Sequence, residues 1–360
     1  MRVNVRVDAS SAIGTGHLRR SLALALALCA QGDEVRFITR DLGFDAGAMI
    51  RAAGIAPPLL LPAPDDSPFA PDPAIAHASW AGVTTARDIK ETVKIARPFR
   101  ADWMVVDSYA FGAAWHQGVR EALDCRIAAI DDLADRGMDC DLLIDHTFTP
   151  DHRAKYDGLL ASKTSVLGGP AYGLLGPAFA KAPRCAFCEK VRSVGVFMGG
   201  VDAGGHSALA LDALDAAGFC GPVEVASTSA NPSLGALHDR VRARPLTTLT
   251  LDQPDLAGFF ARHDLQIGAG GGASLERCCI GVPTLLVIVA DNQNAVAPHL
   301  AAAGIVALAT EPGVDAMAAS LVDLIADAPR RRALAERSRA LVDGHGAARV
   351  ARRMRERHHD

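Results

Sequence analysis

The stretch VNVRVDASSAIGTGHLRRSLALALAL, residues 3–28, decides the fold. It begins with a short apolar run, passes through a turn that contains two glycines, and continues as a hydrophobic helical pattern. An apolar strand that leads through a glycine turn into such a helix is the first βα unit of a nucleotide-binding type of sheet.

The alternation of strand and helix patterns continues along the 360 residues. Most of the strands are apolar at nearly every position, which predicts parallel sheets covered by helices on both faces. Strands are predicted at 3–8, 34–39, 58–62, 103–108, 126–131, 142–145, 193–200, 222–227, 247–251, 265–270, 284–289 and 305–309. Helices are predicted at 17–31, 45–53, 84–97, 112–123, 205–217, 232–243, 254–262, 273–280, 292–303, 313–327 and 329–342.

One segment interrupts this alternation and predicts a domain boundary. Residues 147–190 are rich in glycine and proline and have no sustained strand and helix pattern. A second irregular stretch, 62–80, is a loop rich in proline and aspartate. We therefore expect two Rossmann-like doubly wound domains that face an interdomain cleft: 1–150, a connector at 151–190, 191–345, and a terminal basic helix at 346–360 that packs back on the first domain.

Composition excludes several classes of function. The chain is 49% hydrophobic and 22% charged, as is usual for a globular protein, and its net charge of −4 gives no footprint for nucleic acid. The first residues lack the apolar core of a signal peptide, and no apolar run reaches the length of a membrane span. Cys185 and Cys188 form a lone pair without a second pair at metal-site spacing. We expect a cytoplasmic protein with no membrane contact and no bound metal.

The turn in the opening stretch contains the first candidate site. Gly14 and Gly16 allow a tight turn and a close approach to a ligand, and His17 falls in the first turn of the following helix. The positive end of a helix favours a neutral imidazole, which can take a proton from water. A histidine that only hydrogen-bonds the turn is an equally good interpretation of the spacing. The turn lacks the third glycine of a dinucleotide fingerprint, so no nicotinamide cofactor is expected.

A second candidate site lies in IGAGGGASLERCCIGVP, residues 267–283. A buried strand ends there in three glycines that lead into a helix start, and such a start binds anions through free N–H groups and the helix dipole. No lysine follows the glycines, so this is not a Walker loop. Glu276 lies one helical turn further on and suits two ribose hydroxyls. A plain glycine loop with a surface glutamate is the alternative interpretation.

Further polar residues and glycines follow other predicted strands. Gly199 and Gly200 end a strand whose backbone could approach a diphosphate or a sugar. Asn292 and Gln293 open a predicted helix, where they either cap it or bind sugar hydroxyls, and capping alone is the commoner case. In the first domain, the strand ends carry Asp107, Ser108, Tyr109, Asp131 and Asp132.

Taken in order, eight short motifs give the chain a resemblance to a known family. They are DASSAIGTGHLRR (8–20), VDSY (106–109), IDDLADR (130–136), CDLLID (140–145), GPAYGLL (169–175), MGGVD (198–202), GAGGGASLER (268–277) and DNQN (291–294). The chain resembles the UDP-sugar hydrolases of pseudaminic acid biosynthesis, which serve flagellin glycosylation and act on UDP-2,4-diacetamido-2,4,6-trideoxy-β-L-altropyranose. That family is related to the MurG-type glycosyltransferases and has the GT-B fold.

The resemblance implies a reaction in which water attacks the anomeric carbon and UDP departs. It implies that His17 activates or orients the water, and that Tyr109 and Asn292 lie at the catalytic centre. Glu276 would bind the ribose diol. The remaining implied contacts to sugar, phosphates and nucleotide are Gly14, Gly16, Gly272, Ala273, Ser274 and Leu275. Their positions at strand ends add Gly199, Gly200, Gly271 and Gln293 as candidates for substrate binding. No cofactor or metal is implied, because helix and backbone N–H groups stabilise the departing diphosphate.

Two departures from the family pattern affect the choice of sugar. The connector Tyr172–Phe179 lacks the charged residues that are common in the family, and the chain carries the additional loop at 62–80 and a basic tail. A GT-B glycosyltransferase that uses a UDP-amino sugar is therefore an alternative, and a nucleotide-sugar-binding protein without catalysis is a third. The expected partners are a UDP-amino sugar and water, with the protein acting as a monomer. Uracil as the base is inferred from the family.

Overall fold

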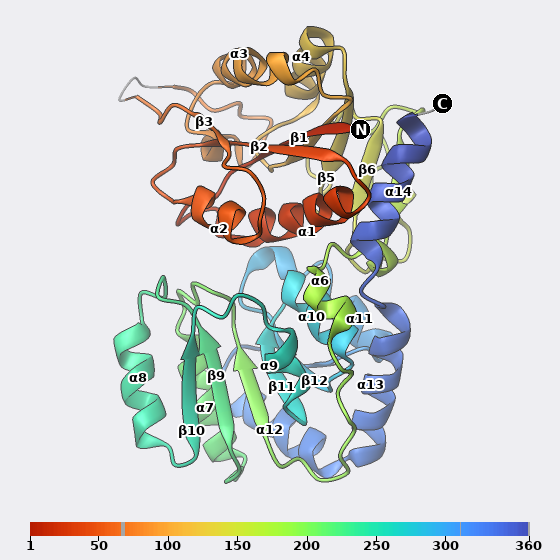
Figure 1. Ribbon diagram of the computed structural model, residues 1–360. Coiled ribbons are helices and arrows are strands. Elements are labelled where there is room, and N and C mark those ends of the chain that lie inside the picture. Colours follow the sequence, from red (N-terminus) through yellow and green to blue (C-terminus); the bar gives the residue numbers. More distant parts are fainter. Residues whose placement is uncertain (66–68, 310, 359–360) are drawn as a thin grey trace. The chain divides into compact units, whose positions relative to one another are not determined.

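The computed structural model describes residues 1–65, 69–309 and 311–358, which fold into two compact α/β units (Figure 1). The first unit comprises Met1–Pro177 together with the chain from His345 onward, and the second comprises Ala178–Gly344. Each unit is built on one parallel sheet, which confirms the predicted pair of doubly wound α/β domains. None of the helices within the described ranges combines the length and the apolar character that crossing a membrane requires.

The sheet of the first unit has seven strands in the order β3-β2-β1-β4-β5-β6-β7. From β1 the chain adds β2 and β3 on one side, and then it crosses back to add β4 to β7 on the other side. The connections that follow β1 and β4 therefore diverge, and their divergence leaves room for a ligand at the carboxyl ends of these strands. The strands are β1 (Arg2–Val7), β2 (Glu34–Arg40), β3 (Leu59–Leu61), β4 (Trp103–Asp107), β5 (Arg126–Ile130), β6 (Leu142–Asp145) and β7 (Ser165–Gly168).

Both faces of this sheet are covered by helices, as Figure 1 shows for α1 and α2 on one face and for α3 and α4 on the other. Alternate residues of β4 enter two separate cores: Trp103 and Val105 belong to the core that includes α1, while Met104 and Val106 belong to the core that includes α4. The helices are α1 (Gly16–Ala30), α2 (Ala46–Ala52), α3 (Thr85–Ala96), α4 (Ala113–Leu123), α5 (His152–Lys155) and α14 (Gly346–His358), with 3₁₀ turns η1 (Ala78–Ala81), η2 (Arg97–Phe99) and η3 (Pro170–Tyr172).

The last helix, α14, packs against α1 and completes the first core. Val350, Ala351 and Met354 are fully buried there. Arg355 donates a hydrogen bond of 2.7 Å from Nη2 to Asp33 Oδ1, which fixes the far end of the helix. A residue from the end of the sequence is thus part of the same hydrophobic core as the first strand.

A fully buried charged network joins β1, β2 and α3. Arg6 lies 2.5 Å from Asp8 and 2.8 Å from Asp88, and Arg40 also lies 2.8 Å from Asp88. The indole N–H of Trp115 donates to the same Asp88 carboxylate at 2.9 Å. Burial acts to raise the pKa of Asp88, but Arg6 and Arg40 outweigh it and lower the pKa to about 2. The carboxylate therefore remains charged and compensates two buried guanidinium groups.

The sheet of the second unit has six parallel strands in the order β10-β9-β8-β11-β12-β13. These strands are β8 (Val194–Phe197), β9 (Val223–Ser227), β10 (Thr247–Leu251), β11 (Leu265–Ala269), β12 (Thr284–Val287) and β13 (Ala307–Leu308). The helices are α6 (Pro177–Lys181), α7 (His206–Ala216), α8 (Leu234–Ala243), α9 (Ala257–Ala261), α10 (Gly272–Ile280), α11 (Ala297–Ala302), α12 (Val314–Ala326) and α13 (Ala328–Leu341), with the 3₁₀ turn η4 (Asp291–Gln293). Here β8 and β11 are neighbours, so the loops after them lie side by side.

Two segments differ from the sequence prediction. The short strand β7 lies within 151–190, the segment for which the sequence predicts a connector without strands, and it extends the sheet by pairing with β6. The helix predicted at 292–303 is wrong at its start, because Asn292 and Gln293 form the turn η4 and the α-helix begins only at Ala297. Pro298 suits the first turn of a helix, which favours that later start. Residues 66–68 of the proline-rich loop and 359–360 of the tail lie outside the described residues.

Candidate functional site

The turn after β1 places His17 at the second residue of α1, as the sequence predicts. Gly14 has a φ of +74°, which favours glycine, and its N–H donates to Ser10 O at 2.8 Å to close the turn. Gly16 has open space where a side chain would begin, so local packing does not require glycine there. The His17 side chain is only 8% exposed, and it points toward the end of β4.

His17 is held by a carboxylate on the neighbouring strand. Its Nδ1 lies 2.5 Å from Asp107 Oδ1, and Arg20 Nη2 lies 2.7 Å from the same oxygen. A charged carboxylate only accepts hydrogen bonds, so Nδ1 carries a proton, and in the neutral form of the ring Nε2 has the lone pair. The 3.1 Å between Arg20 Nη2 and His17 Nδ1 is then the separation of two donors that share one acceptor. This is the arrangement of a histidine oriented for general base catalysis.

The electrostatic balance around Asp107 keeps it charged. Burial acts to raise the pKa of this carboxyl group, but Arg20 and His17 outweigh it and hold the pKa far below its ordinary value. Ser21 Oγ adds a hydrogen bond of 3.1 Å. With a neutral His17 ring, the group formed by Arg20, Asp107 and Asp132 carries one net negative charge. A proton taken by His17 therefore enters a site that already contains its counter-charge.

Tyr109 connects this cluster to the end of β5. Its hydroxyl donates a short hydrogen bond to Asp132 Oδ1, and its ring lies edge-on to His17 with centroids 4.4 Å apart. Burial, together with the charge of Asp132, raises the pKa of Tyr109 well above its ordinary value, so the hydroxyl stays protonated. Arg20 Nη1 lies 3.1 Å from the other Asp132 oxygen. The sequence indicates both Tyr109 and Asp132 at strand ends, and the structure brings them together with His17.

Two aromatic residues beside this cluster escape the sequence analysis. Trp80 belongs to η1 and lies with its ring centroid 6.3 Å from that of His17 and 5.9 Å from that of Tyr109. The ring centroid of His77 lies 4.5 Å from that of Trp80 and 5.7 Å from that of Tyr109. Both are half-buried. They end the proline-rich loop, whose composition gives no signal for a site, so only the fold shows their proximity to His17.

His146, directly after β6, is a second buried histidine of this region that the sequence analysis leaves unassigned. Its Nδ1 lies 3.5 Å from the Leu174 N–H. Burial, reinforced by the positive charge of Arg20, lowers the pKa of His146 to about 4. His146 is therefore neutral at physiological pH and adds no positive charge to the site.

A pH dependence of stability follows from the buried histidines of the first unit. The pKa of His146 is lowered to about 4 and that of His116 on α4 to about 3, whereas an unfolded histidine titrates near 6.5. Below that pH the unfolded chain binds protons that the folded chain excludes. The free energy of unfolding should therefore fall as the pH drops from about 6.5 toward 4, by up to about 1.4 kcal/mol per pH unit for each histidine.

The measurement is urea unfolding at pH 7.0 and at pH 5.0, followed by tryptophan fluorescence. All three tryptophans, Trp80, Trp103 and Trp115, belong to the first unit, so their signal reports on that unit. The double variant His116→Gln/His146→Asn should show a markedly smaller loss between the two pH values. An equal loss in the variant and the wild type contradicts the assignment to these histidines.

In the second unit, the glycine loop after β11 leads directly into α10. Gly271 precedes the helix with a φ of +89°, and Gly272 is its first residue. The first N–H groups of a helix lack acceptors within the helix, and Gly271 and Gly272 are exposed. Ala273 is half-buried, while Ser274 and Leu275 are buried, so Leu275 has only its backbone to offer a ligand. Glu276 lies half-buried one turn into the helix.

Two neighbouring strand ends flank this loop. Gly199, with a φ of +102°, and Gly200 follow β8, and Gly200 O accepts a hydrogen bond of 2.6 Å from Thr228 Oγ1. Gln293 follows β12, and its Oε1 accepts from the Val289 N–H at 2.9 Å, so this amide closes its own turn. Asn292 is exposed on η4. The loops after β8, β11 and β12 thus present backbone groups at the carboxyl edge of one sheet, which suits an anionic ligand.

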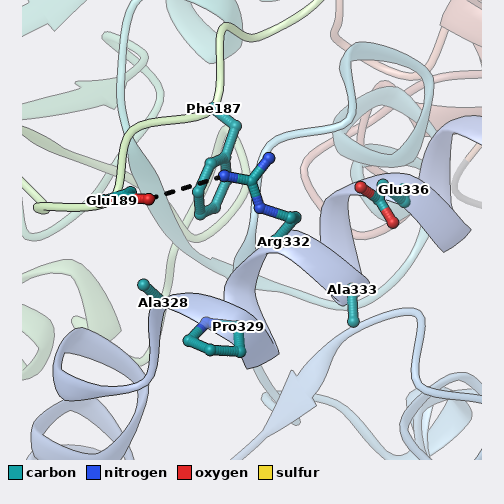
Figure 2. Close-up of a pocket in the computed structure, with 7 residues that line it drawn as sticks. All are labelled: Phe187, Glu189, Ala328, Pro329, Arg332, Ala333 and Glu336. Carbon is teal, nitrogen blue, oxygen red and sulfur yellow. Dashed lines mark ion pairs between the residues drawn. The ribbon is translucent and has the colours of Figure 1, made fainter.

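A pocket elsewhere in the second unit does not share these features (Figure 2). It is formed by the start of α13 and by the loop that leads into the amino end of β8. Arg332 stacks over the ring of Phe187, with 4.3 Å between its guanidinium carbon and the ring centroid, and lies 4.0 Å from Glu189. These contacts pair Arg332 with a ring and a carboxylate of its own pocket. We therefore place the candidate site at the carboxyl edges of the sheets.

Comparison with known proteins supports the architecture. No family model matches the sequence. The spore coat polysaccharide biosynthesis protein SpsG of Bacillus subtilis (strain 168) is 29% identical over 199 residues, which cover 52% of this chain and 57% of SpsG. The match thus spans little more than half the length of this curated relative.

Solved structures match nearly the whole chain. MurG of Acinetobacter baumannii is 16% identical, with a TM-score of 0.66 over 99% of this chain and 100% of that one. UDP-GlcNAc 2-epimerase from Neisseria meningitidis, bound to UDP-GlcNAc, is 12% identical, with a TM-score of 0.66 over 99% and 100% of the two chains. At such low identity the likeness concerns the fold. Together with the two parallel sheets, it shows that the chain has a GT-B fold of two Rossmann-like units.

Proposed function

We propose that this protein is a nucleotide-sugar enzyme of sugar biosynthesis, and that it hydrolyses a UDP-linked diacetamido-trideoxy sugar in pseudaminic acid biosynthesis. Water attacks the anomeric carbon, the bond from that carbon to the diphosphate oxygen breaks, and its electron pair leaves with UDP. The observation that carries this proposal is the contact of 2.5 Å between His17 Nδ1 and Asp107 Oδ1. It leaves Nε2 to take the proton of the attacking water.

The side chains around His17 support a sugar as the group acted on. The Tyr109 hydroxyl, the Asp132 carboxylate and the half-buried Trp80 ring lie within one cluster with His17. Polar groups of this kind bind hydroxyl and amide groups, whereas an aromatic face packs on the apolar side of a sugar ring. We assign sugar binding to this cluster and the catalytic base to His17.

The second unit supports the nucleotide diphosphate as the leaving group. The N-terminus of α10 and the exposed Gly271 and Gly272 suit its negative charge, and Glu276 suits the ribose diol. Asn292 and Gln293 remain candidates for contacts to the substrate. The UDP-GlcNAc bound by the epimerase of the same fold and the polysaccharide biosynthesis of SpsG agree with a UDP-sugar as substrate.

A glycosyltransferase that uses a UDP-amino sugar is the second candidate. The likeness of the fold to MurG favours it as much as it favours the hydrolase. Such an enzyme needs the same diphosphate loop and the same ribose contact, so those residues do not separate the two functions. The acceptor does separate them, because a transferase requires a second substrate where the hydrolase uses water.

The test is phosphorus-31 NMR of the protein with UDP-2,4-diacetamido-2,4,6-trideoxy-β-L-altropyranose in ¹⁸O-enriched water and no acceptor. We expect UDP to accumulate without an isotope shift, since attack at the anomeric carbon places the labelled oxygen in the sugar. A labelled phosphate contradicts attack at carbon. Parallel reactions with UDP-GlcNAc and with a CMP-linked sugar measure the selectivity of the protein for the sugar and for the nucleotide base.

Two other results would overturn the hydrolase assignment. UDP release that appears only after a hydroxylated acceptor is added supports the transferase. Binding of the UDP-sugar without any turnover, in water or with acceptors, supports a binding protein without catalysis. In both cases the nucleotide still binds, which calorimetric titration with UDP measures separately.

A further inference from the structure

Arg277 is a charged residue buried at the base of the glycine loop, and none of the roles above includes it. It lies on the second turn of α10 and is 1% exposed. Its Nη2 donates hydrogen bonds to Ala269 O at 2.5 Å and to Ser274 Oγ at 3.4 Å. These partners are the last residue of β11 and a residue in the first turn of α10, so the guanidinium spans the base of the loop.

The guanidinium lacks the carboxylate compensation that the buried Arg6 and Arg40 have. Its Nε and Nη1 are buried without a hydrogen-bond partner, and no ion pair with a carboxylate is found for it in the part of the chain that the structure describes. Arg6 and Arg40, by contrast, share Asp88. Burial lowers the pKa of Arg277 to about 10, against smaller opposing effects of Cys278 and Glu276. At neutral pH it is therefore a buried cation without an ion-pair partner among the described residues, which destabilises the free protein.

The Arg277 guanidinium lies next to the strand ends that lead into two glycine loops. A side chain built on Gly268 would come within 2.4 Å of Arg277 Nη1 and within 2.7 Å of Phe197 O. Phe197 ends β8, directly before Met198 and Gly199, and Gly268 is the second-last residue of β11, two positions before Gly270 of the second loop. The unpaired Nη1 thus lies where the ends of β8 and β11 meet, beneath both loops.

We propose that Arg277 is a positioning residue that supplies the uncompensated positive charge of a nucleoside diphosphate site at the start of α10. The inference rests on the proposed function, which places a diphosphate at this loop. Arg277 holds the loop through Ala269 O, and its field reaches the anion through a poorly polarisable interior, where charges interact more strongly than in water. The bound diphosphate compensates the cation, and the protein selects a diphosphate over an uncharged nucleoside.

The experiment compares the affinities for UDP and for uridine by calorimetric titration of the full-length protein. Arg277→Met keeps most of the side-chain volume and removes the charge. We expect the preference for UDP over uridine to fall by about tenfold or more, with little change in the affinity for uridine. We also expect the unliganded variant to be at least as stable as the wild type in scanning calorimetry, because a buried unpaired charge is gone.

Arg331→Met is the matched control, because Arg331 is also fully buried in the second unit. Its guanidinium donates to the carbonyl oxygens of Leu324 and Ile325 at 2.7 and 2.6 Å, away from the glycine loops. That change should leave the preference for UDP over uridine unchanged. An equal loss of preference in both variants contradicts a specific role of Arg277.

A second variant, Arg277→Lys, keeps the charge and loses the geometry of the guanidinium. We expect it to retain the preference for UDP to within about threefold, and a loss as large as that of Arg277→Met overturns the electrostatic role. An unchanged preference in Arg277→Met overturns the inference while the proposed function stands. If the wild type binds UDP no better than uridine, the proposed diphosphate site itself is wrong.

Discussion

A His17→Asn protein is expected to release UDP from the nucleotide sugar about 10²- to 10⁴-fold more slowly than the wild type, the usual contribution of a positioned general base. Asparagine still accepts and donates hydrogen bonds near Asp107, but it has no lone pair basic enough to take a proton from water. The affinity for UDP should be unchanged, because the nucleotide is assigned to the second unit. The rate is measured by phosphorus-31 NMR, and the affinity by calorimetric titration.

The control for this substitution is His238→Asn on α8, a half-buried histidine of the second unit, which should keep the wild-type rate. His17 is a cleaner target than Asp107, since Asp107 also binds Arg20 and Ser21. A rate within about threefold of the wild type, together with normal UDP binding, contradicts the role of His17 as the base. Loss of UDP binding in this variant contradicts the separate assignment of the nucleotide.

Asp88→Asn is expected to lower the free energy of unfolding of the first unit by up to about 3–5 kcal/mol, because Arg6 and Arg40 lose the buried carboxylate that they share. Arg6 then keeps only Asp8, and Arg40 keeps only Glu91. The substitution keeps the volume of the side chain and so creates no cavity. Arg6 and Arg40 both lie 2.8 Å from the lost charge, and both are fully buried. Urea unfolding followed by tryptophan fluorescence measures the effect, since every tryptophan belongs to this unit.

An exposed ion pair of the same unit provides the comparison. Arg51 lies 3.4 Å from Asp45, with side chains 53% and 68% exposed. Arg51→Gln should change the free energy of unfolding by less than about 1 kcal/mol, because solvent screens exposed pairs. A similar, small effect of both substitutions would show that Arg6 and Arg40 are compensated without Asp88.

The regular elements of the fold could be predicted from the sequence because the strands are buried on both faces. Runs such as WMVVD in β4 are apolar at almost every position, and this pattern survives without knowledge of the tertiary structure. The strand β7 has four residues, of which only Leu167 is buried and the other three are half-buried, and it lies among glycines and prolines. Its pairing with β6 is a tertiary contact, and the local periodicity of the sequence does not predict such contacts.

Of the residues in the candidate site, the sequence predicts only those that lie at strand ends. His17, Asp107, Tyr109 and Asp132 all follow strands that the pattern identifies, so a rule about carboxyl ends finds them. Their mutual contacts depend on which strands are neighbours, which the pattern leaves undetermined.

Residues outside strand ends carried no comparable signal. Trp80 lies in the 3₁₀ turn η1, within a stretch that the sequence predicts as an irregular loop. Arg277 lies inside a helix, where an arginine is ordinarily exposed. That Arg277 is buried and without a counter-charge follows from the packing of α10 against Phe260 and the ends of two strands. The sequence gives the position of a charged side chain along a helix, but it does not tell whether a carboxylate lies near that side chain in the fold.

The contact of α14 with α1 has a consequence for the order in which the chain matures during translation. The ribosome delivers Val350, Ala351 and Met354 only after the whole second unit, yet these residues cover α1, which is synthesised before that unit. Until then the nascent first unit exposes a hydrophobic surface along α1. The second unit, Ala178–Gly344, is by then fully synthesised. We expect a separately expressed fragment 1–177 to aggregate, and addition of residues 345–360 in trans or by circular permutation to rescue it.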